Sequence, residues 1–193
     1  MAQELDQNKR TYGFRLIREE DVEWARLLHN DPDVLSMLKD PTPVAPDTQK
    51  RWYEGLKNSA ASKRIVVSCN GERMGIVRLD EIDPHNRSAA VGLDIHRDFR
   101  GKGHATPIYA ILLDYCFHVF DLHRCWLDVA SFNEVAYRLY QKLGFVEEGR
   151  ARKMIYRFGA YHDYVKMGML KEEYLAMPRL HEIKNGLSFS FDM

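Results

Sequence analysis

The chain has 193 residues, of which 45% are hydrophobic and 29% are charged, a composition typical of a single soluble globular domain. Lys and Arg total 28, and Asp and Glu also total 28, so no broad basic field favours binding to nucleic acid or to an anionic membrane. No stretch approaches the 18 or so apolar residues of a membrane span, and we therefore expect a cytoplasmic protein without nucleic-acid or membrane partners.

The first half of the chain alternates between strand and helix patterns. Acidic residues at 19–21 favour a helix N-terminus there, because they complement its partial positive charge. Asn70 and Gly71 form a strong hairpin signal between two apolar runs. Three prolines predict a loop at 40–47. The predicted elements are a strand at 12–17, helices from about Asp21 and at 49–59, and strands at 64–69, 74–80 and 89–95.

The second half continues this alternation, and Gly144 stands where a helix is expected to end. Its predicted elements are helices at 104–120 and 133–143 and strands at 124–129, 145–150 and 163–170. The fold class is therefore α+β, with a mixed sheet covered by helices on both faces. We expect one domain over residues 1–175, followed by a polar C-terminal tail over 176–193 that packs loosely.

The three cysteines give no sign of a metal or disulfide framework. Cys69, Cys116 and Cys125 are odd in number, and none of them belongs to a C-x-x-C motif. A disulfide framework and a zinc site are both unexpected on this basis, and free thiols in a reducing compartment fit better. We predict no metal cofactor.

The sharpest motif is the segment RGKGHA at 100–105, which lies between a predicted strand and a predicted helix. Its two glycines allow the backbone to turn and to present consecutive N–H groups, and the following helix N-terminus adds partial positive charge. This arrangement suits a pyrophosphate group. The simpler alternative is a basic turn that contains glycines.

Two motifs together resemble the GNAT superfamily of N-acetyltransferases. The first is the R-x-x-G-x-A pattern of Arg100, Gly103 and Ala105 after a strand, and the second is the segment NEVAYRLYQKLGF at 133–145. The resemblance covers residues 12–170 and implies a three-layer fold with a splayed central sheet that binds acetyl-CoA. The segment RFGAYHD at 157–163 resembles the subgroup that includes the ribosomal-protein alanine acetyltransferases and several small-molecule acetyltransferases.

The resemblance also implies roles for individual residues in binding acetyl-CoA. The backbone of Ile95 and His96 would pair with the pantetheine arm. Asn133 is either a helix cap alone or a cap that also contacts this arm. The pyrophosphate would be held by the turn and its flanking charges, which are Arg100, Gly101, Lys102, Gly103, His104 and Ala105.

The resemblance places Tyr140 where a tyrosine protonates the departing thiolate, and Tyr137, one turn earlier, is the fallback. Packing alone is the simpler role for each. Amine acetylation also needs a base, because an ammonium group has no lone pair. Glu81 is the preferred candidate because it follows a strand where the family commonly has its base, and a solvated surface acid is the alternative. The other candidates are Asp80, Asp94 and His85.

These features predict an enzyme that transfers an acetyl group from acetyl-CoA to a primary amine of a small molecule, by direct attack in a ternary complex. The acceptor could be an amino sugar, polyamine, amino acid or antibiotic. Acids along the acceptor cleft would favour a polyamine, and an open groove would favour a peptide. The alternatives are a protein N-terminal acetyltransferase of the ribosomal-protein type and a non-catalytic acyl-CoA-binding regulatory module. A homodimer is implied by resemblance alone.

Overall fold

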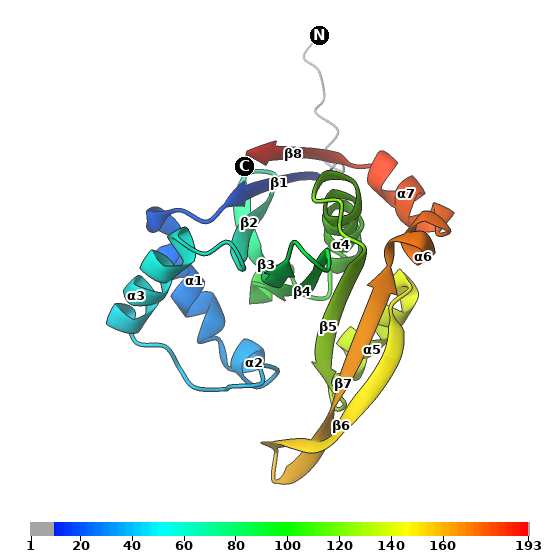
Figure 1. The fold of residues 1–193 in the computed structure, drawn as a ribbon. Coiled ribbons are helices and arrows are strands. Elements are labelled where there is room, and N and C mark those ends of the chain that lie inside the picture. The colour runs from blue at the N-terminus through cyan, green and yellow to red at the C-terminus, as the bar shows by residue number, and fades with distance from the viewer. Residues whose placement is uncertain (1–9, 193) are drawn as a thin grey trace.

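The computed structural model describes residues 10–192 and contains one eight-stranded sheet flanked by helices (Figure 1). The strands are β1 (Thr11–Leu16), β2 (Lys63–Cys69), β3 (Glu72–Asp83), β4 (Ser88–Ile95), β5 (Arg124–Ala130), β6 (Val146–Arg157), β7 (Ala160–Leu170) and β8 (Ser188–Asp192). The helices are α1 (Val22–His29), α2 (Pro32–Leu35), α3 (Pro46–Lys57), α4 (Ala105–Asp114), α5 (Glu134–Leu143), α6 (Lys171–Leu175) and α7 (Pro178–Asn185). Three short turns of other helical types are η1 (Glu19–Asp21), η2 (Arg97–Phe99) and η3 (Tyr115–Val119), of which η3 is π-helical.

The sheet is mixed, and it opens in the middle. The strand order is β6-β7-β5-β4-β3-β2-β1-β8, and the central strands β4 and β5 are parallel. Within the described chain these two strands pair at three positions, Ser88 to Ala90 with Arg124 to Trp126, although both strands continue further. Beyond Ala90 they separate, which confirms the predicted splayed sheet.

The two faces of the sheet are covered by different helices, as β3 illustrates. Because side chains alternate along a strand, Ile76 points to one face and Val77 to the other. Ile76 packs with Ala25, Leu28 and Val34 of α1 and α2. Val77 belongs to the larger core, which includes the buried side chains of α4. The predicted helices on both faces are therefore confirmed, and Figure 1 shows α1–α3 gathered at one side of the molecule.

The segment after residue 175 differs from the loosely packed tail that we expected. It forms α7 and then β8, which pairs in parallel with β1 at the edge of the sheet. Leu180 is 1% exposed, and the Phe191 ring centroid lies 5.1 Å from that of Phe14. Most residues of this segment are polar, so the sequence offers little sign of the few apolar side chains through which it packs against the rest of the domain.

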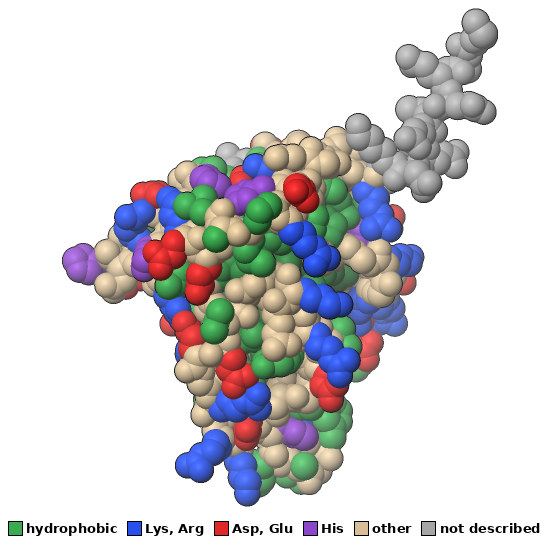
Figure 2. All heavy atoms as spheres, turned by 90° about the vertical axis from the view of Figure 1, so that its right-hand side faces the viewer, with side chains coloured by type: hydrophobic (Ala, Val, Ile, Leu, Met, Phe, Trp, Pro, Cys, Tyr) green, Lys and Arg blue, Asp and Glu red, His purple; other side chains and the backbone are tan. Residues whose placement is uncertain are grey.

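The surface carries both signs of charge. On the face shown in Figure 2, acidic and basic side chains are interspersed among apolar ones. Among residues 10–192, no helix is long and apolar enough to cross a lipid bilayer.

Candidate active site

The separation of β4 from β5 leaves a slot with a volume of 690 Å³. Leu93, Asp94 and Ile95 line it from β4, and Asp128 to Ala130 line it from β5. Helices α4 and α5 contribute the side chains on its other wall, namely Ala105, Tyr109, Asn133, Ala136, Leu139 and Tyr140. The slot therefore lies where the resemblance predicts the arm of acetyl-CoA.

The backbone of β4 offers only part of the predicted pairing edge. The His96 N–H donates to the Met74 carbonyl at 2.8 Å, so this donor is used inside the sheet. Because hydrogen-bonding direction alternates along an antiparallel strand, Ile95 faces the opposite edge, toward the slot. The Ile95 carbonyl already accepts a bond from Arg100 Nε at 2.7 Å, which leaves the Ile95 N–H for a ligand. The structure thus brings Ile95 to the slot and does not bring His96 there.

The glycine turn stands at the end of the slot, directly before α4. Gly101 and Gly103 adopt φ values of +71° and +79°, in the left-handed region that side chains disfavour. Gly101 and Ala105 line the slot, and Lys102 is exposed beside them. Backbone N–H groups at a helix N-terminus with no intervening side chains suit the pyrophosphate of acetyl-CoA.

Two side chains of the same segment contact other parts of the chain. Arg100 forms ion pairs with Asp33 at 2.9 Å and with Asp31 at 3.3 Å, so its charge is neutralised by acids next to it. The His104 ring is 5% exposed, and its Nδ1 lies 3.0 Å from the Tyr12 hydroxyl. The structure therefore uses His104 in the core and Arg100 to fix the start of α2. Arg100 also lines the slot, whereas His104 does not.

Helix α5 contributes two of the predicted residues to the slot. The Asn133 side chain caps the helix by accepting a hydrogen bond from the Ala136 N–H at 3.2 Å, and it also lines the slot. Tyr140 is half-buried, with its hydroxyl 3.5 Å from that of Tyr109. Burial raises the pKa of Tyr140, so its hydroxyl keeps a proton that it can donate. The Tyr137 hydroxyl instead donates a hydrogen bond to the Glu147 carboxylate at 2.7 Å, and Tyr137 does not line the slot.

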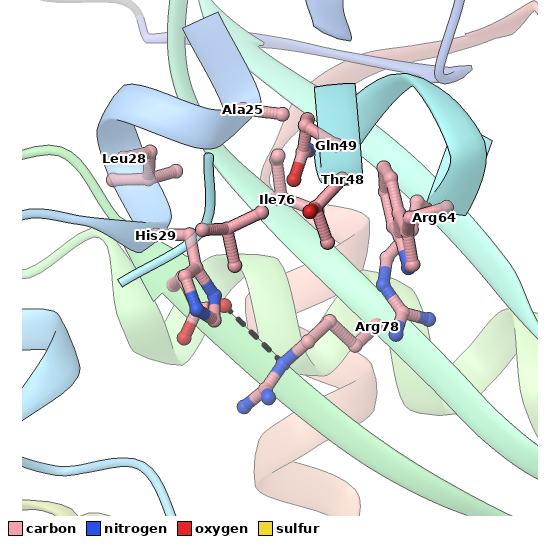
Figure 3. A pocket seen from close by; sticks show the side chains of 11 residues that line it. Ala25, Leu28, His29, Thr48, Gln49, Arg64, Ile76 and Arg78 are labelled. Carbon is pink, nitrogen blue, oxygen red and sulfur yellow. Dashed lines mark ion pairs between the residues drawn. The ribbon is translucent and has the colours of Figure 1, made fainter. Parts of the chain in front are cut away.

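A smaller cavity of 250 Å³ lies on the α1 and α3 side of the sheet (Figure 3). Its walls come from α1, α3, β2 and β3, and three of its residues also line the slot: His29, Arg78 and Asp94. Figure 3 shows the His29 and Arg78 side chains at this cavity, and its dashed line marks the ion pair between Arg78 and Asp94. The two cavities therefore share these side chains, as expected for neighbouring sites that bind an acetyl donor and an acetyl acceptor.

The preferred base candidate does not reach either cavity. Glu81 is exposed, has a φ of +50°, and lies in a bulge of β3 where pairing with β4 is interrupted. It lines neither the slot nor the smaller cavity. Sequence reasoning missed His29 and Arg78. An arginine between Val77 and Leu79, in the apolar part of β3, was the signal that could have identified Arg78.

Comparison with known proteins identifies the family. Residues 12–146 match the model of the acetyltransferase (GNAT) domain. The chain belongs to the GNAT acetyltransferases. Spermidine N(1)-acetyltransferase of Escherichia coli strain K12 is 31% identical to this GNAT chain over 163 residues, which are 84% of this chain and 88% of that protein. YdaF of Bacillus subtilis, provisionally named a ribosomal N-acetyltransferase, is 35% identical over 131 residues. These residues are 68% of this chain and 69% of the YdaF chain.

A solved structure agrees in fold. The crystal structure of spermidine N-acetyltransferase from Vibrio cholerae, in complex with CoA and spermine, superposes on this GNAT chain with a TM-score of 0.80. The match has 31% identity and covers 85% of this chain and 98% of that one. These findings confirm the predicted family, fold and enzyme class, with acetyl-CoA as cosubstrate. Among the described residues, no group of three His, Cys, Asp or Glu side chains could hold a metal ion.

Proposed function

We propose that this chain transfers the acetyl group of acetyl-CoA to a primary amine of a small molecule, in a complex that holds both substrates. The observation that carries the proposal is the meeting of two cavities at one place. The slot between β4 and β5 ends at the glycine turn, and the smaller cavity opens onto it at His29, Arg78 and Asp94. A donor and an acceptor can therefore approach from opposite sides without a covalent enzyme intermediate.

The donor side is built from backbone and from small residues. The N–H groups of the segment from Gly101 to Ala105 would hold the pyrophosphate, and the Ile95 N–H would pair with the pantetheine arm. Asn133 would fix the start of α5 at the same wall. When bound there, acetyl-CoA supplies an activated thioester.

The candidates for the acid and for the base both line the slot. The amine nitrogen forms the new bond to the acetyl carbon, the carbon–sulfur bond breaks, and Tyr140 donates its proton to the leaving thiolate. The base must take a proton from the ammonium group beforehand. We assign this step to His29, because an imidazole nitrogen can accept a proton and this side chain lines both cavities, whereas the Asp94 carboxylate is paired with Arg78. Glu81, the preferred candidate from sequence, has no access to the cavities.

The relatives suggest several acceptor classes. The Escherichia coli and Vibrio cholerae proteins are named for spermidine, and a 27% identical Escherichia coli protein is named L-amino acid N-acetyltransferase AaaT. YdaF supports protein N-termini as the second candidate, but the 250 Å³ acceptor cavity favours a small molecule. A cytoplasmic location and a homodimer remain predictions.

The test is release of coenzyme A from acetyl-CoA over a panel of amines. Polyamines, amino acids, amino sugars and peptides with free N-termini form the panel. We expect release to depend on a small amine and the initial velocities to give intersecting double-reciprocal lines. Binding of acetyl-CoA with no release for any amine would instead favour the regulatory module.

A further inference from the structure

The side chains that line the acceptor cavity include two arginines and one carboxylate. Arg64 and Arg78 line it together with one carboxylate, that of Asp94. Arg64 is already paired with Asp80 at 2.8 Å, and its guanidinium lies 5.8 Å from the ring centroid of Trp52. Arg78 is therefore the cation that faces the place where the two cavities meet.

Arg78 is held so that part of its guanidinium stays available. Its Nε lies 3.2 Å from Asp94 Oδ2, and no hydrogen bond joins its two Nη groups to a residue of the described chain. A Cβ atom at Gly92 would come within 2.8 Å of Arg78 Nη2, so the glycine makes room for this side chain. The neighbouring Asp94 carboxylate raises the pKa of Arg78 and keeps it charged.

Most carboxylates around the slot already have partners and are therefore less available to bind a substrate with several positive charges. Asp33 is paired with Arg100, Asp94 with Arg78, and Asp128 with Lys166. Asp40 accepts two hydrogen bonds from Thr42 within its own loop. Three of the four acids that line the slot therefore already have a cationic partner, which offers a polyamine less than a strip of free carboxylates would.

We propose that the acceptor is a primary amine that also carries a carboxylate or a phosphate, and that the Nη groups of Arg78 bind this anion. A guanidinium presents paired N–H donors whose spacing matches both groups. The bound anion would direct the amine toward the acetyl group, close to His29. This inference rests on the proposed function and specifies the substrate class of the same site.

The experiment compares amines that differ only in the anionic group. The pairs are ornithine with putrescine, glucosamine 6-phosphate with glucosamine, and phosphoethanolamine with ethanolamine, with spermidine as a polycationic reference. In at least one pair we expect kcat/KM for the anionic member to be about tenfold higher or more. The pair that responds distinguishes a carboxylate from a phosphate.

Variants of Arg78 separate recognition of the anion from loss of fold. Arg78→Gln should abolish the preference for the anionic member, Arg78→Lys should restore part of it, and Arg78→Glu should shift activity toward spermidine. Stabilisation of each variant against heat by acetyl-CoA reports an intact donor site. Arg138→Gln, which removes an exposed cation of α5 outside both cavities, is the matched control and should keep the wild-type preference.

The outcomes separate this inference from the proposed function. A wild-type enzyme that acetylates spermidine or the partners without an anionic group as well as the anionic amines, or a preference unchanged in Arg78→Gln, overturns the inference alone. Failure to acetylate any amine, with acetyl-CoA bound, overturns the proposed function and the inference with it.

Discussion

At the scale of single residues, the proposed chemistry depends on Tyr140. Its hydroxyl is placed in the slot by α5, and burial raises the pKa of the phenol above its ordinary value of 10. Tyr140→Phe should lower kcat by about 10²–10⁴-fold, the usual contribution of general acid catalysis, with little effect on acetyl-CoA affinity. Tyr137→Phe is the matched control on the same helix and should remain active. Full activity of Tyr140→Phe would transfer the acid role to another group.

The raised pKa also sets the expected pH dependence. A phenol whose folded-state pKa lies above 10 is protonated at every lower pH, so Tyr140 should not limit the rate on the alkaline side up to about pH 9.5. The rate should rise with pH as the base and the amine lose their protons. A fall in kcat well below pH 9 that disappears in Tyr140→Phe would contradict this interpretation.

A pair of substitutions tests the base. His29→Gln should reduce kcat/KM by about 10²-fold or more and flatten the rise in rate with pH, because the imidazole that lines both cavities is lost. Glu81→Gln should leave the pH profile close to that of the wild type, because Glu81 is exposed outside them. The reverse result would restore the assignment of the base to Glu81.

At the scale of elements, our proposal assigns binding of acetyl-CoA to the turn before α4. Gly103 has a φ of +79°, and a β-branched residue there would strain the turn and displace its N–H groups. Gly103→Val should therefore abolish acetyl-CoA binding while the protein stays folded, as isothermal calorimetry and circular dichroism can measure. Gly159→Val is a matched control, since Gly159 has a φ of +78° in the turn between β6 and β7. Loss of binding in both variants would point to general strain instead.

The elements also illustrate what sequence reasoning can reach. The predictions from sequence that the structure confirms depend on local signals. These are the glycines of the turn, the hairpin at Asn70 and Gly71, the Asn133 cap and the end of α5 at Gly144. The separation of β4 from β5 came from family resemblance. The meeting of His29 from α1 with Arg78 from β3 depends on tertiary packing, and no local pattern predicts it.

At the scale of the whole molecule, the question is where the domain ends. The segment that we expected to be a loose tail places Leu180 in the main core and β8 beside β1. Leu180→Ala should lower the free energy of unfolding by about 2–5 kcal/mol, as burial of a leucine side chain implies. Leu175→Ala is the matched control, because Leu175 is 52% exposed and should change stability little. Equal, small effects of both would show that the segment contributes little to the fold.

The central claim is acetyl transfer to an amine in the slot between β4 and β5. The most direct measurement is mass spectrometry of the products formed from acetyl-CoA and an anionic amine such as ornithine, together with the coenzyme A released. The account predicts one N-acetylated amine for each coenzyme A, and loss of both in Tyr140→Phe. Coenzyme A release without an acetylated amine, or a product that forms equally well in Tyr140→Phe, would contradict it.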